Sequence, residues 1–362
     1  MNAAAKNYDG VNKYIRITDI DEASSTYTDK DIVSPDGFLT DNYLVNNRDI
    51  LLARTGASTG KSYLYKKSDG KLYYAGFLIR ANVTTHDPYF VFSQLHTHRY
   101  WRWVSIMSAR SGQPGINSQE YSSFPIYTTS IEEESKIAKL LSLLDERIAT
   151  QNKIIEDLKK LKSAIIDYAI NSLNTDFAKF GSLYEMAGEG GTPTTSNASF
   201  YDNGKIPFIK IDDLKQKYLT ENKDFITELG LQKSSAWLVP THSILFSNGA
   251  TIGEISITTY PVCTKQGILG IVPKQNIDVE FLYYFMSSSY FKKAVSRIVT
   301  EGTMKTAYLK DINNILCPIP TKEKQQEIAK MPSALNSKID FEQSILKLFC
   351  SQKQYLLRQM FI

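Results

Sequence analysis

A short run rich in glycine, lysine and serine is the first place where this chain could carry chemistry. Residues 54–62 read RTGASTGKS, a spacing close to that of phosphate-binding loops. The run is one residue shorter than that motif requires, and no helix is predicted to follow it. A similar run at 247–254 ends in Glu254 where the lysine would stand. We therefore interpret both runs as glycine-rich loops that connect strands.

Two other local patterns also resemble reactive sites. Residues 87–90 read DPYF, which is similar to the D-P-P-Y loop of amino-methyltransferases but lacks one proline and any F-x-G-x-G cofactor loop. Residues 278–281 are their counterpart, so we interpret both as helix starts with an aspartate N-cap. His96 and His98 lack a third ligand, and we expect a polar surface pair rather than a metal site. No Ser/His/Asp set or pair of carboxylates is evident, and we predict a non-catalytic chain with no cofactor of its own.

The composition describes a globular protein with room for more than one domain. The 362 residues are 42% apolar and 22% charged, and the net charge of +4 is compatible with nucleic acid without requiring it. The three cysteines, Cys263, Cys317 and Cys350, show no metal-ligand spacing and favour reduced thiols. No apolar run reaches membrane-spanning length. We expect a cytoplasmic protein that does not contact membranes.

A long helix at residues 131–173 is the element on which the other parts depend. The stretch contains neither proline nor glycine, and its two apolar lines form a stripe too wide to face solvent. At about 1.5 Å per residue, this helix would span roughly 60 Å, and it requires a second long helix to pack against. Residues 322–362 provide one, although Pro332 is expected to kink or delay it. The predicted coiled-coil positions are Ile148, Ile155, Leu158, Ile165, Ile339, Leu346, Phe349 and Leu356.

The chain is an internal duplication. Residues 14–17 (YIRI) recur as 208–211 (FIKI), and the glycine-rich loops and the long helices recur in the same order. Each second copy lies about 190 residues after the first. The sequence therefore predicts an α+β fold in which two mixed α/β globules alternate with two long antiparallel helices, related by a pseudo-twofold axis.

Polar and basic side chains gather in equivalent loops of the two copies. Such side chains contact phosphates and base edges. Each one taken singly is better explained as a solvated side chain, and only their clustering favours nucleic acid. The candidate DNA contacts are Arg54, Lys61, Arg110, Gln113, Asn117, Asn248, Lys265, Gln266, Thr303, Lys305 and Thr306.

The order of these motifs resembles one protein family over essentially the whole chain. Residues 201–214 (YDNGKIPFIKIDDL), 244–253 (ILFSNGATIG) and 264–273 (TKQGILGIVP) are followed by 302–306 (GTMKT) and 318–329 (PIPTKEKQQEIA). This pattern is similar to the specificity subunit of type I restriction-modification systems. No single motif is very specific, but their order, which occurs twice, is.

The resemblance implies a division of labour. Each globule would read one half of a split, asymmetric sequence in double-stranded DNA. The coiled coil would set the distance between the halves and dock two modification (methyltransferase) subunits, which recruit restriction subunits. S-adenosylmethionine, Mg²⁺ and ATP would be bound only by those partners.

The resemblance also implies domain boundaries. We expect a first recognition domain at 1–130, a spacer helix at 131–175, a second recognition domain at 176–320 and a C-terminal helix at 321–362. The first domain has no counterpart of residues 177–193 and is expected to be N-terminally shortened by about twenty residues. Two alternatives stay open: the recognition part of a type II-like restriction enzyme, or a decoy subunit that titrates methyltransferase partners.

Overall fold

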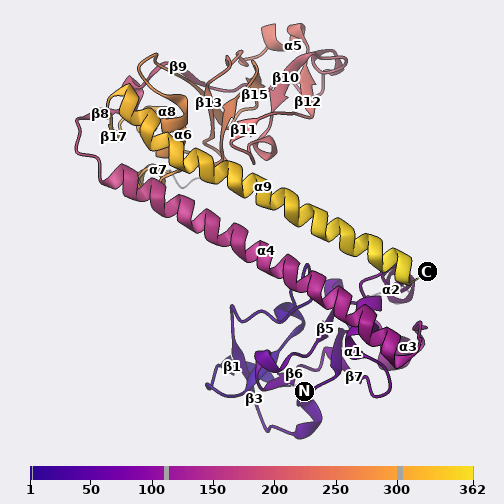
Figure 1. Ribbon diagram of the computed structural model, residues 1–362. Helices are drawn as coiled ribbons and strands as arrows, with labels where there is room; N and C mark the ends of the chain where they lie inside the picture. Colours follow the sequence, from indigo (N-terminus) through magenta and orange to yellow (C-terminus); the bar gives the residue numbers. More distant parts are fainter. Residues whose placement is uncertain (2, 110–113, 300–304, 362) are drawn as a thin grey trace. The chain divides into compact units, whose positions relative to one another are not determined.

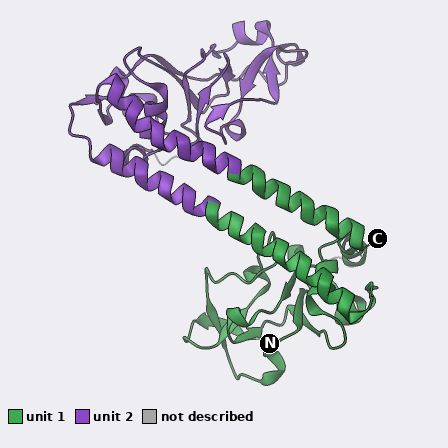
Figure 2. Cartoon of the chain, viewed as in Figure 1, with its two compact units in different colours: residues 1–154, 342–362 green, residues 155–341 purple. Residues whose placement is uncertain are grey.

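A computed structural model describes residues 1, 3–109, 114–299 and 305–361. It divides into two compact units, residues 1–154 with 342–362 (unit 1) and residues 155–341 (unit 2) (Figure 2). The long helices α4 (Ile131–Asn171) and α9 (Lys322–Met360) each contribute to both units (Figure 1). Each unit therefore contains one globule and a segment of both long helices.

Unit 1 is built on a three-stranded antiparallel sheet in the order β5-β4-β7. Its central strand is completely buried, and β2 pairs in parallel with β6 beside it. Helices α1 and α2 cover one face, where Phe92 and Tyr100 pack on Ile50 and Leu52. The elements are β1 (Ala4–Asn7), β2 (Lys13–Ile15), β3 (Val33–Asp36), β4 (Asp49–Ala53), β5 (Ser62–Leu64), β6 (Leu72–Tyr74), β7 (Leu78–Asn82), α1 (Pro88–Gln94), α2 (His98–Ser108) and α3 (Ser118–Ser122).

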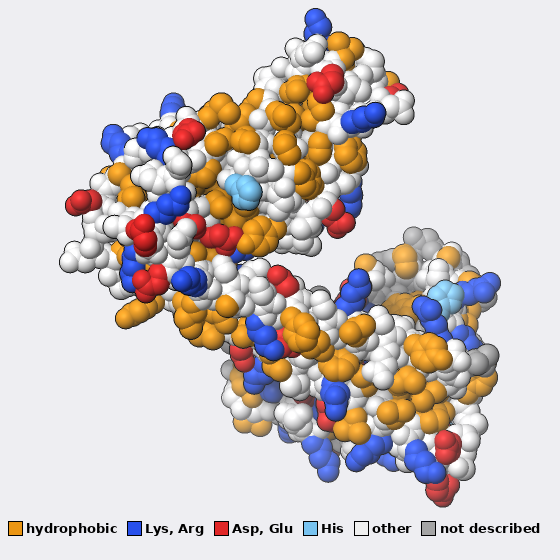
Figure 3. All heavy atoms as spheres, turned by 45° about the horizontal axis from the view of Figure 1, so that its top comes forward, with side chains coloured by type: hydrophobic (Ala, Val, Ile, Leu, Met, Phe, Trp, Pro, Cys, Tyr) orange, Lys and Arg blue, Asp and Glu red, His pale blue; other side chains and the backbone are white. Residues whose placement is uncertain are grey.

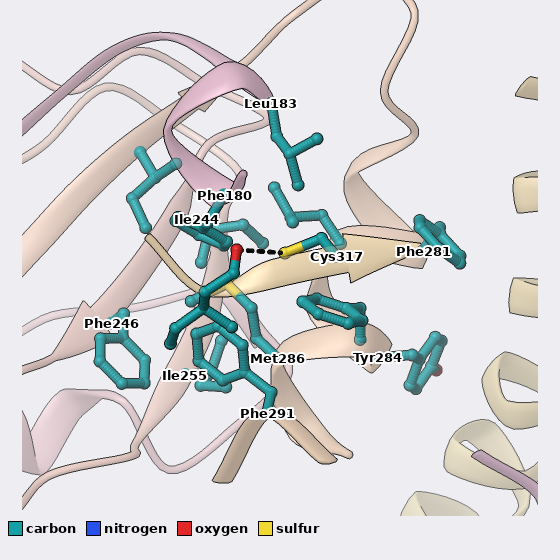
Figure 4. Packing of buried hydrophobic residues seen from close by; sticks show 14 of the residues in the cluster. Phe180, Leu183, Ile244, Phe246, Ile255, Phe281, Tyr284, Met286, Phe291 and Cys317 are labelled. Atoms are coloured by element: carbon teal, nitrogen blue, oxygen red, sulfur yellow. Dashed lines mark hydrogen bonds between the residues drawn. The ribbon is translucent and has the colours of Figure 1, made fainter. Parts of the chain in front are cut away.

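Unit 2 repeats this arrangement with additions. Its sheet has the order β11-β14-β13-β16-β9, and β10 pairs in parallel with β15 as β2 does with β6. The core lies between this sheet and α6 and α7, with Phe246, Met286 and Phe291 near Ile255 (Figure 4). The elements are β8 (Phe177–Lys179), β9 (Tyr184–Glu189), β10 (Ile206–Ile209), β11 (Tyr218–Leu219), β12 (Asp224–Ile226), α5 (Glu228–Gln232), β13 (Ile244–Ser247), β14 (Ile255–Thr258), β15 (Cys263–Thr264), β16 (Ile268–Pro273), α6 (Val279–Ser287), α7 (Ser289–Ile298), α8 (Leu309–Ile312) and β17 (Leu316–Pro318).

The duplication is visible element by element. Strands β4, β5 and β7 correspond to β13, β14 and β16, and helices α1 to α4 correspond to α6 to α9. The predicted aspartate caps are present, because Asp87 accepts from the main-chain N–H of Tyr89 (2.9 Å) and Asp278 from that of Phe281 (2.9 Å). The predicted α+β duplication is confirmed.

The long helices run antiparallel within unit 1. Asp145 pairs with Lys353 at 2.6 Å, and the side-chain amide of Gln151 donates to the main-chain oxygen of Glu342 at 3.0 Å, so later residues of α4 meet earlier residues of α9. The predicted delay at Pro332 is wrong, because α9 begins at Lys322 and continues past the proline. One lost main-chain hydrogen bond does not end a helix whose flanks are packed.

The predicted apolar stripe of the coiled coil is only partly buried. Ile155 and Ile339 are buried, and Ile148, Leu158, Ile165, Leu346, Phe349 and Leu356 are half-buried. Ile154, Leu161 and Tyr168 are exposed, contrary to the expectation that the whole stripe avoids solvent. The stripe is wider than one neighbouring helix can cover.

Candidate nucleic-acid interface

Three loop segments of unit 2 meet beside the end of β13. Gly249 forms a β-bridge with Thr306. The main-chain N–H of Ala307 donates to the oxygen of Asn248 (2.8 Å), and the N–H of Asn248 donates to the oxygen of Gly267 (3.0 Å). The structure thus brings together predicted contacts from three segments that are distant in sequence.

The exposure of these predicted contacts differs. Lys265, Gln266 and Lys305 are exposed, and Thr306 is half-buried. Asn248 is only 1% exposed, and its amide donates to the oxygen of Ala307 at 3.2 Å. The expectation that Asn248 is exposed is wrong, because the main-chain bonds of the loop draw the side chain inside.

A glycine pair shapes the turn that presents Lys265 and Gln266. A Cβ atom at Gly190 would lie 2.2 Å from the main-chain oxygen of Thr264, so only glycine permits this approach. Glu189 accepts from the main-chain N–H of Gly267 at 3.0 Å. In the sequence, the doublet Gly190-Gly191 was the signal that could have predicted this close approach of two main-chain segments.

The equivalent loops of unit 1 have the same main-chain arrangement. Thr55 forms a β-bridge with Gly115, the N–H of Ile116 donates to the oxygen of Arg54 (2.9 Å), and the N–H of Gly56 donates to that of Pro114 (3.0 Å). The loop at 54–62 is a 3₁₀ turn between β4 and β5 with no helix after it, which agrees with its interpretation as a strand connection.

Two of the predicted contacts of unit 1 have partners within the unit. Arg54 is exposed, but the Lys61 ammonium pairs with Glu22 at 3.0 Å. Asn117 caps α3, and its side-chain oxygen accepts from the N–H of Glu120 at 2.9 Å. Arg110, Gln113 and Thr303 lie outside the described residues.

On the face seen in Figure 3, Lys and Arg side chains are spread among apolar ones rather than gathered in one patch.

A buried lysine ties the globule of unit 2 to α9. The Lys217 side chain is 3% exposed, and its ammonium contacts Glu280, the Tyr284 hydroxyl (2.9 Å) and the Ser333 hydroxyl (3.0 Å). Burial would raise the pKa of Glu280, but hydrogen bonds from Lys217, Tyr218 and Ser333 outweigh it and lower that pKa. These residues were missed in the sequence, because β11, α6 and α9 meet only in the fold.

The two histidines that could suggest a metal site, His96 and His98, differ in their surroundings. The His96 ring is half-buried between the oxygen of Phe92 and the hydroxyl of Ser25, both at 3.0 Å, and burial lowers its pKa to about 4. The expected surface pair is therefore wrong for His96, although His98 is exposed. Among the described residues, no group of three or more His, Cys, Asp or Glu side chains could hold a metal ion.

In the part of the chain that the structure describes, no helix is both long and apolar enough to cross a bilayer.

Comparison with known proteins places these features in one family. The family model described as "Type I restriction modification DNA specificity domain" matches residues 1–160 and 174–348. A Methanocaldococcus jannaschii protein, whose name assigns it to the MjaX type I restriction enzyme as a specificity subunit, is 25% identical over 73% of this chain and 65% of its own length. The MjaIX specificity subunit of the same organism is 32% identical over 46% of this chain and 38% of its own length.

A solved structure shares the fold. The S subunit of a type I restriction-modification system from M. genitalium is 17% identical, with a TM-score of 0.60 over 98% of this chain and 89% of that one. The alignments span less than two thirds of the length of the two M. jannaschii relatives. Since the family model covers both copies of the duplicated sequence, the chain belongs to the family of type I restriction-modification DNA specificity proteins.

Proposed function

We propose that this chain is the sequence-reading subunit of a type I restriction-modification complex. Each globule reads one half of a split, asymmetric target in double-stranded DNA, and the long helices dock two methyltransferase subunits. The chain does no chemistry itself. The partner subunits bind S-adenosylmethionine, Mg²⁺ and ATP. The methyltransferase subunits unstack the target adenine and methylate it, and the restriction subunits join the complex through them.

One observation carries the proposal of two readers. Both units hold the same bridged loop arrangement, Thr55 with Gly115 and Gly249 with Thr306, but with different side chains around it. A repeated backbone with unlike side chains supports two readers of unlike sequences. Exposed cations such as Arg54, Lys265 and Lys305 suit phosphate and base-edge contacts.

The exposed apolar side chains of the long helices support a docking role. On α4, Leu140, Ile154, Leu161 and Tyr168 lie at multiples of seven residues and are 39–77% exposed. On α9, the same seven-residue spacing recurs. Its members are Phe341 (58% exposed), Leu348 (69%) and Tyr355 (63%). Apolar stripes of this regularity are suited to helices of a partner.

Co-expression with methyltransferase subunits of a type I system tests the proposal. Methylated adenines are then mapped across the host genome. We expect a split motif with two unlike halves and a constant gap. A single half-motif would contradict the two-reader proposal. A stable complex without any methylated motif would instead support the decoy alternative.

A further inference from the structure

The turn between β6 and β7 of unit 1 carries an exposed phenylalanine that is not among the predicted DNA contacts. The side chain of Phe77 is 61% exposed. The main-chain N–H of Leu78 donates to the oxygen of Ala75 at 2.9 Å and closes the turn. The N–H of Arg54 donates to the oxygen of Phe77 at 3.0 Å. Main-chain bonds therefore fix this turn beside the loop that carries Arg54.

Phe77 and Arg54 lie opposite each other on paired segments. Ala53 of β4 pairs with Leu78 of β7 in antiparallel register, so the bond between Arg54 and Phe77 extends this pairing by one step. Residues directly opposite in such a pair point to the same face, with Cβ atoms about 4.5–5.5 Å apart. Arg54 is also exposed, and its main-chain oxygen accepts from the N–H of Ile116 at 2.9 Å. An aromatic ring and a guanidinium thus leave the same face of a hydrogen-bonded backbone.

The equivalent turn of unit 2 presents other chemistry. Gly267 corresponds to Phe77, because the main-chain oxygen of each accepts a 3.0 Å bond from the residue that follows the central strand of its sheet. Gly267 has a φ of +90°, which side chains rarely adopt. The exposed side chains of this turn are Lys265 and Gln266, and Ala75, only 7% exposed, stands in unit 1 in the place of Lys265. The same turn of the repeat is therefore polar in unit 2 and apolar in unit 1.

The chemistry of the DNA grooves indicates what this apolar turn recognises. A single exposed phenylalanine elsewhere on the surface would need no explanation. Phe77 lies instead beside the exposed cation of Arg54, in the loop arrangement that both units share. The base edges of the major groove offer one apolar group, the 5-methyl group of thymine, and phenylalanine is among the side chains that contact it. An arginine beside that contact suits a neighbouring phosphate.

We infer that Phe77 contacts the 5-methyl group of a thymine in the major groove of the half-target bound by unit 1, and so helps to determine the sequence that this unit reads. The inference rests on the proposed function, because it requires unit 1 to bind DNA. Arg54 holds a neighbouring phosphate and fixes the position of the ring along the groove. Unit 2, with Lys265 and Gln266 on the equivalent turn, reads hydrogen-bonding groups instead.

The test uses the complex of this chain with its methyltransferase subunits and duplexes carrying the methylated motif. Each thymine of the motif is replaced by uracil, one at a time, which removes only the 5-methyl group. Duplex affinities are measured for the wild type, Phe77→Ala and Phe77→Leu. Phe38→Ala is the matched control, because Phe38 is 89% exposed in the same unit and follows β3, outside the β4–β7 pair.

In the wild type and in Phe38→Ala, we expect one uracil to weaken binding about fourfold, the effect of one buried methyl group. Phe77→Ala should bind the thymine duplex about fourfold more weakly and lose nothing further at that uracil. Phe77→Leu keeps an apolar contact and should keep the sensitivity. The sensitive thymine should lie in the half-motif that Lys305→Ala leaves unchanged. Since Phe77 is exposed, all variants should melt at the wild-type temperature, which a structural role of the ring would not allow.

Two results would overturn the inference while leaving the proposed function intact. One is equal uracil sensitivity in the wild type and in Phe77→Ala, even if the variant binds more weakly, because the ring would then contact the DNA without reading thymine. The other is a thymine coupled to Phe77 that lies in the half-motif altered by Lys305→Ala. Failure of the wild-type complex to bind any duplex would overturn both the inference and the proposed function.

Discussion

A side-chain oxygen of Glu134 accepts a 2.9 Å hydrogen bond from the main-chain N–H of Asp87, and this contact joins the start of α4 to the start of α1. The same contact recurs in unit 2, where Gln325 accepts from the N–H of Asp278 at 2.8 Å. Both side chains are at most 1% exposed. A buried polar residue at the same place in the repeat therefore joins each globule to the long helix that follows it.

Removing the oxygen acceptor should destabilise unit 1. Glu134→Ala leaves the buried N–H of Asp87 without its partner, and we expect a loss of about 2 kcal/mol in the free energy of unfolding. Glu134→Gln keeps an acceptor, as Gln325 does in unit 2, and should lose less. Chemical denaturation monitored by tryptophan fluorescence measures both, and equal losses would contradict this account of the contact.

Substitutions at buried and at exposed positions of α4 should have different effects on stability. Ile155 is 6% exposed, so Ile155→Ala should cost about 3 kcal/mol of stability. Leu161 and Tyr168 are 47% and 77% exposed, so changing both to glutamate should leave stability nearly unchanged. The double variant should nevertheless reduce co-purification of methyltransferase subunits at least tenfold.

The exposed charge reversal Lys159→Glu is the control for that double variant. It should retain the partner subunits. Unchanged co-purification of the Leu161/Tyr168 double variant would show that this stripe is not the docking surface.

Substitutions in the unit 2 loops should affect one half of the target. Lys305→Ala, or Lys265→Ala together with Gln266→Ala, removes exposed side chains around the Gly249–Thr306 bridge. We expect relaxed specificity, by about 1–3 kcal/mol per lost base contact, in one half-motif only. Lys61→Ala should change little, since that ammonium is paired with Glu22. Mapping methylated adenines measures this, and changes in both halves would rule out independent readers.

The turn at Gly190 should not tolerate a side chain. Gly190→Ala places a methyl group 2.2 Å from two oxygens of Thr264, and we expect a loss of about 1–3 kcal/mol in the free energy of unfolding, with displacement of the Lys265–Gln266 turn. Gly249→Ala is the control, because its added carbon would lie 3.5 Å from Gly267 Cα. Thermal denaturation compares the two, and equal melting temperatures would refute the steric argument.

The Lys217–Glu280 contact predicts a dependence of stability on pH. The folded-state pKa of Glu280 lies below its ordinary value of 4.5, so its contribution is complete above pH 4.5 and is lost as pH falls through the folded-state pKa. The melting temperature of unit 2 should therefore fall in acid. Glu280→Gln should flatten this part of the curve, and an unchanged acid slope would contradict the assignment.

The duplication, both long helices and both aspartate caps could be predicted because they depend on local spacing. The burial of Asn248 could not, since it depends on main-chain bonds to Gly267 and Ala307. The exposure of Ile154 and Leu161 was also missed, because periodicity identifies an apolar face but not how much of it a neighbour covers.

A heptad insertion tests most directly the proposal that the long helices set the distance between two reading domains. Seven residues added to α4 between Ile154 and Ile155, and seven to α9 between Phe341 and Glu342, lengthen both helices by about 10 Å while keeping the heptad phase. At about 3.4 Å per base pair, the gap between the methylated half-motifs should grow by about three base pairs, with both halves unchanged. An unchanged gap in a methylating complex would contradict the claim.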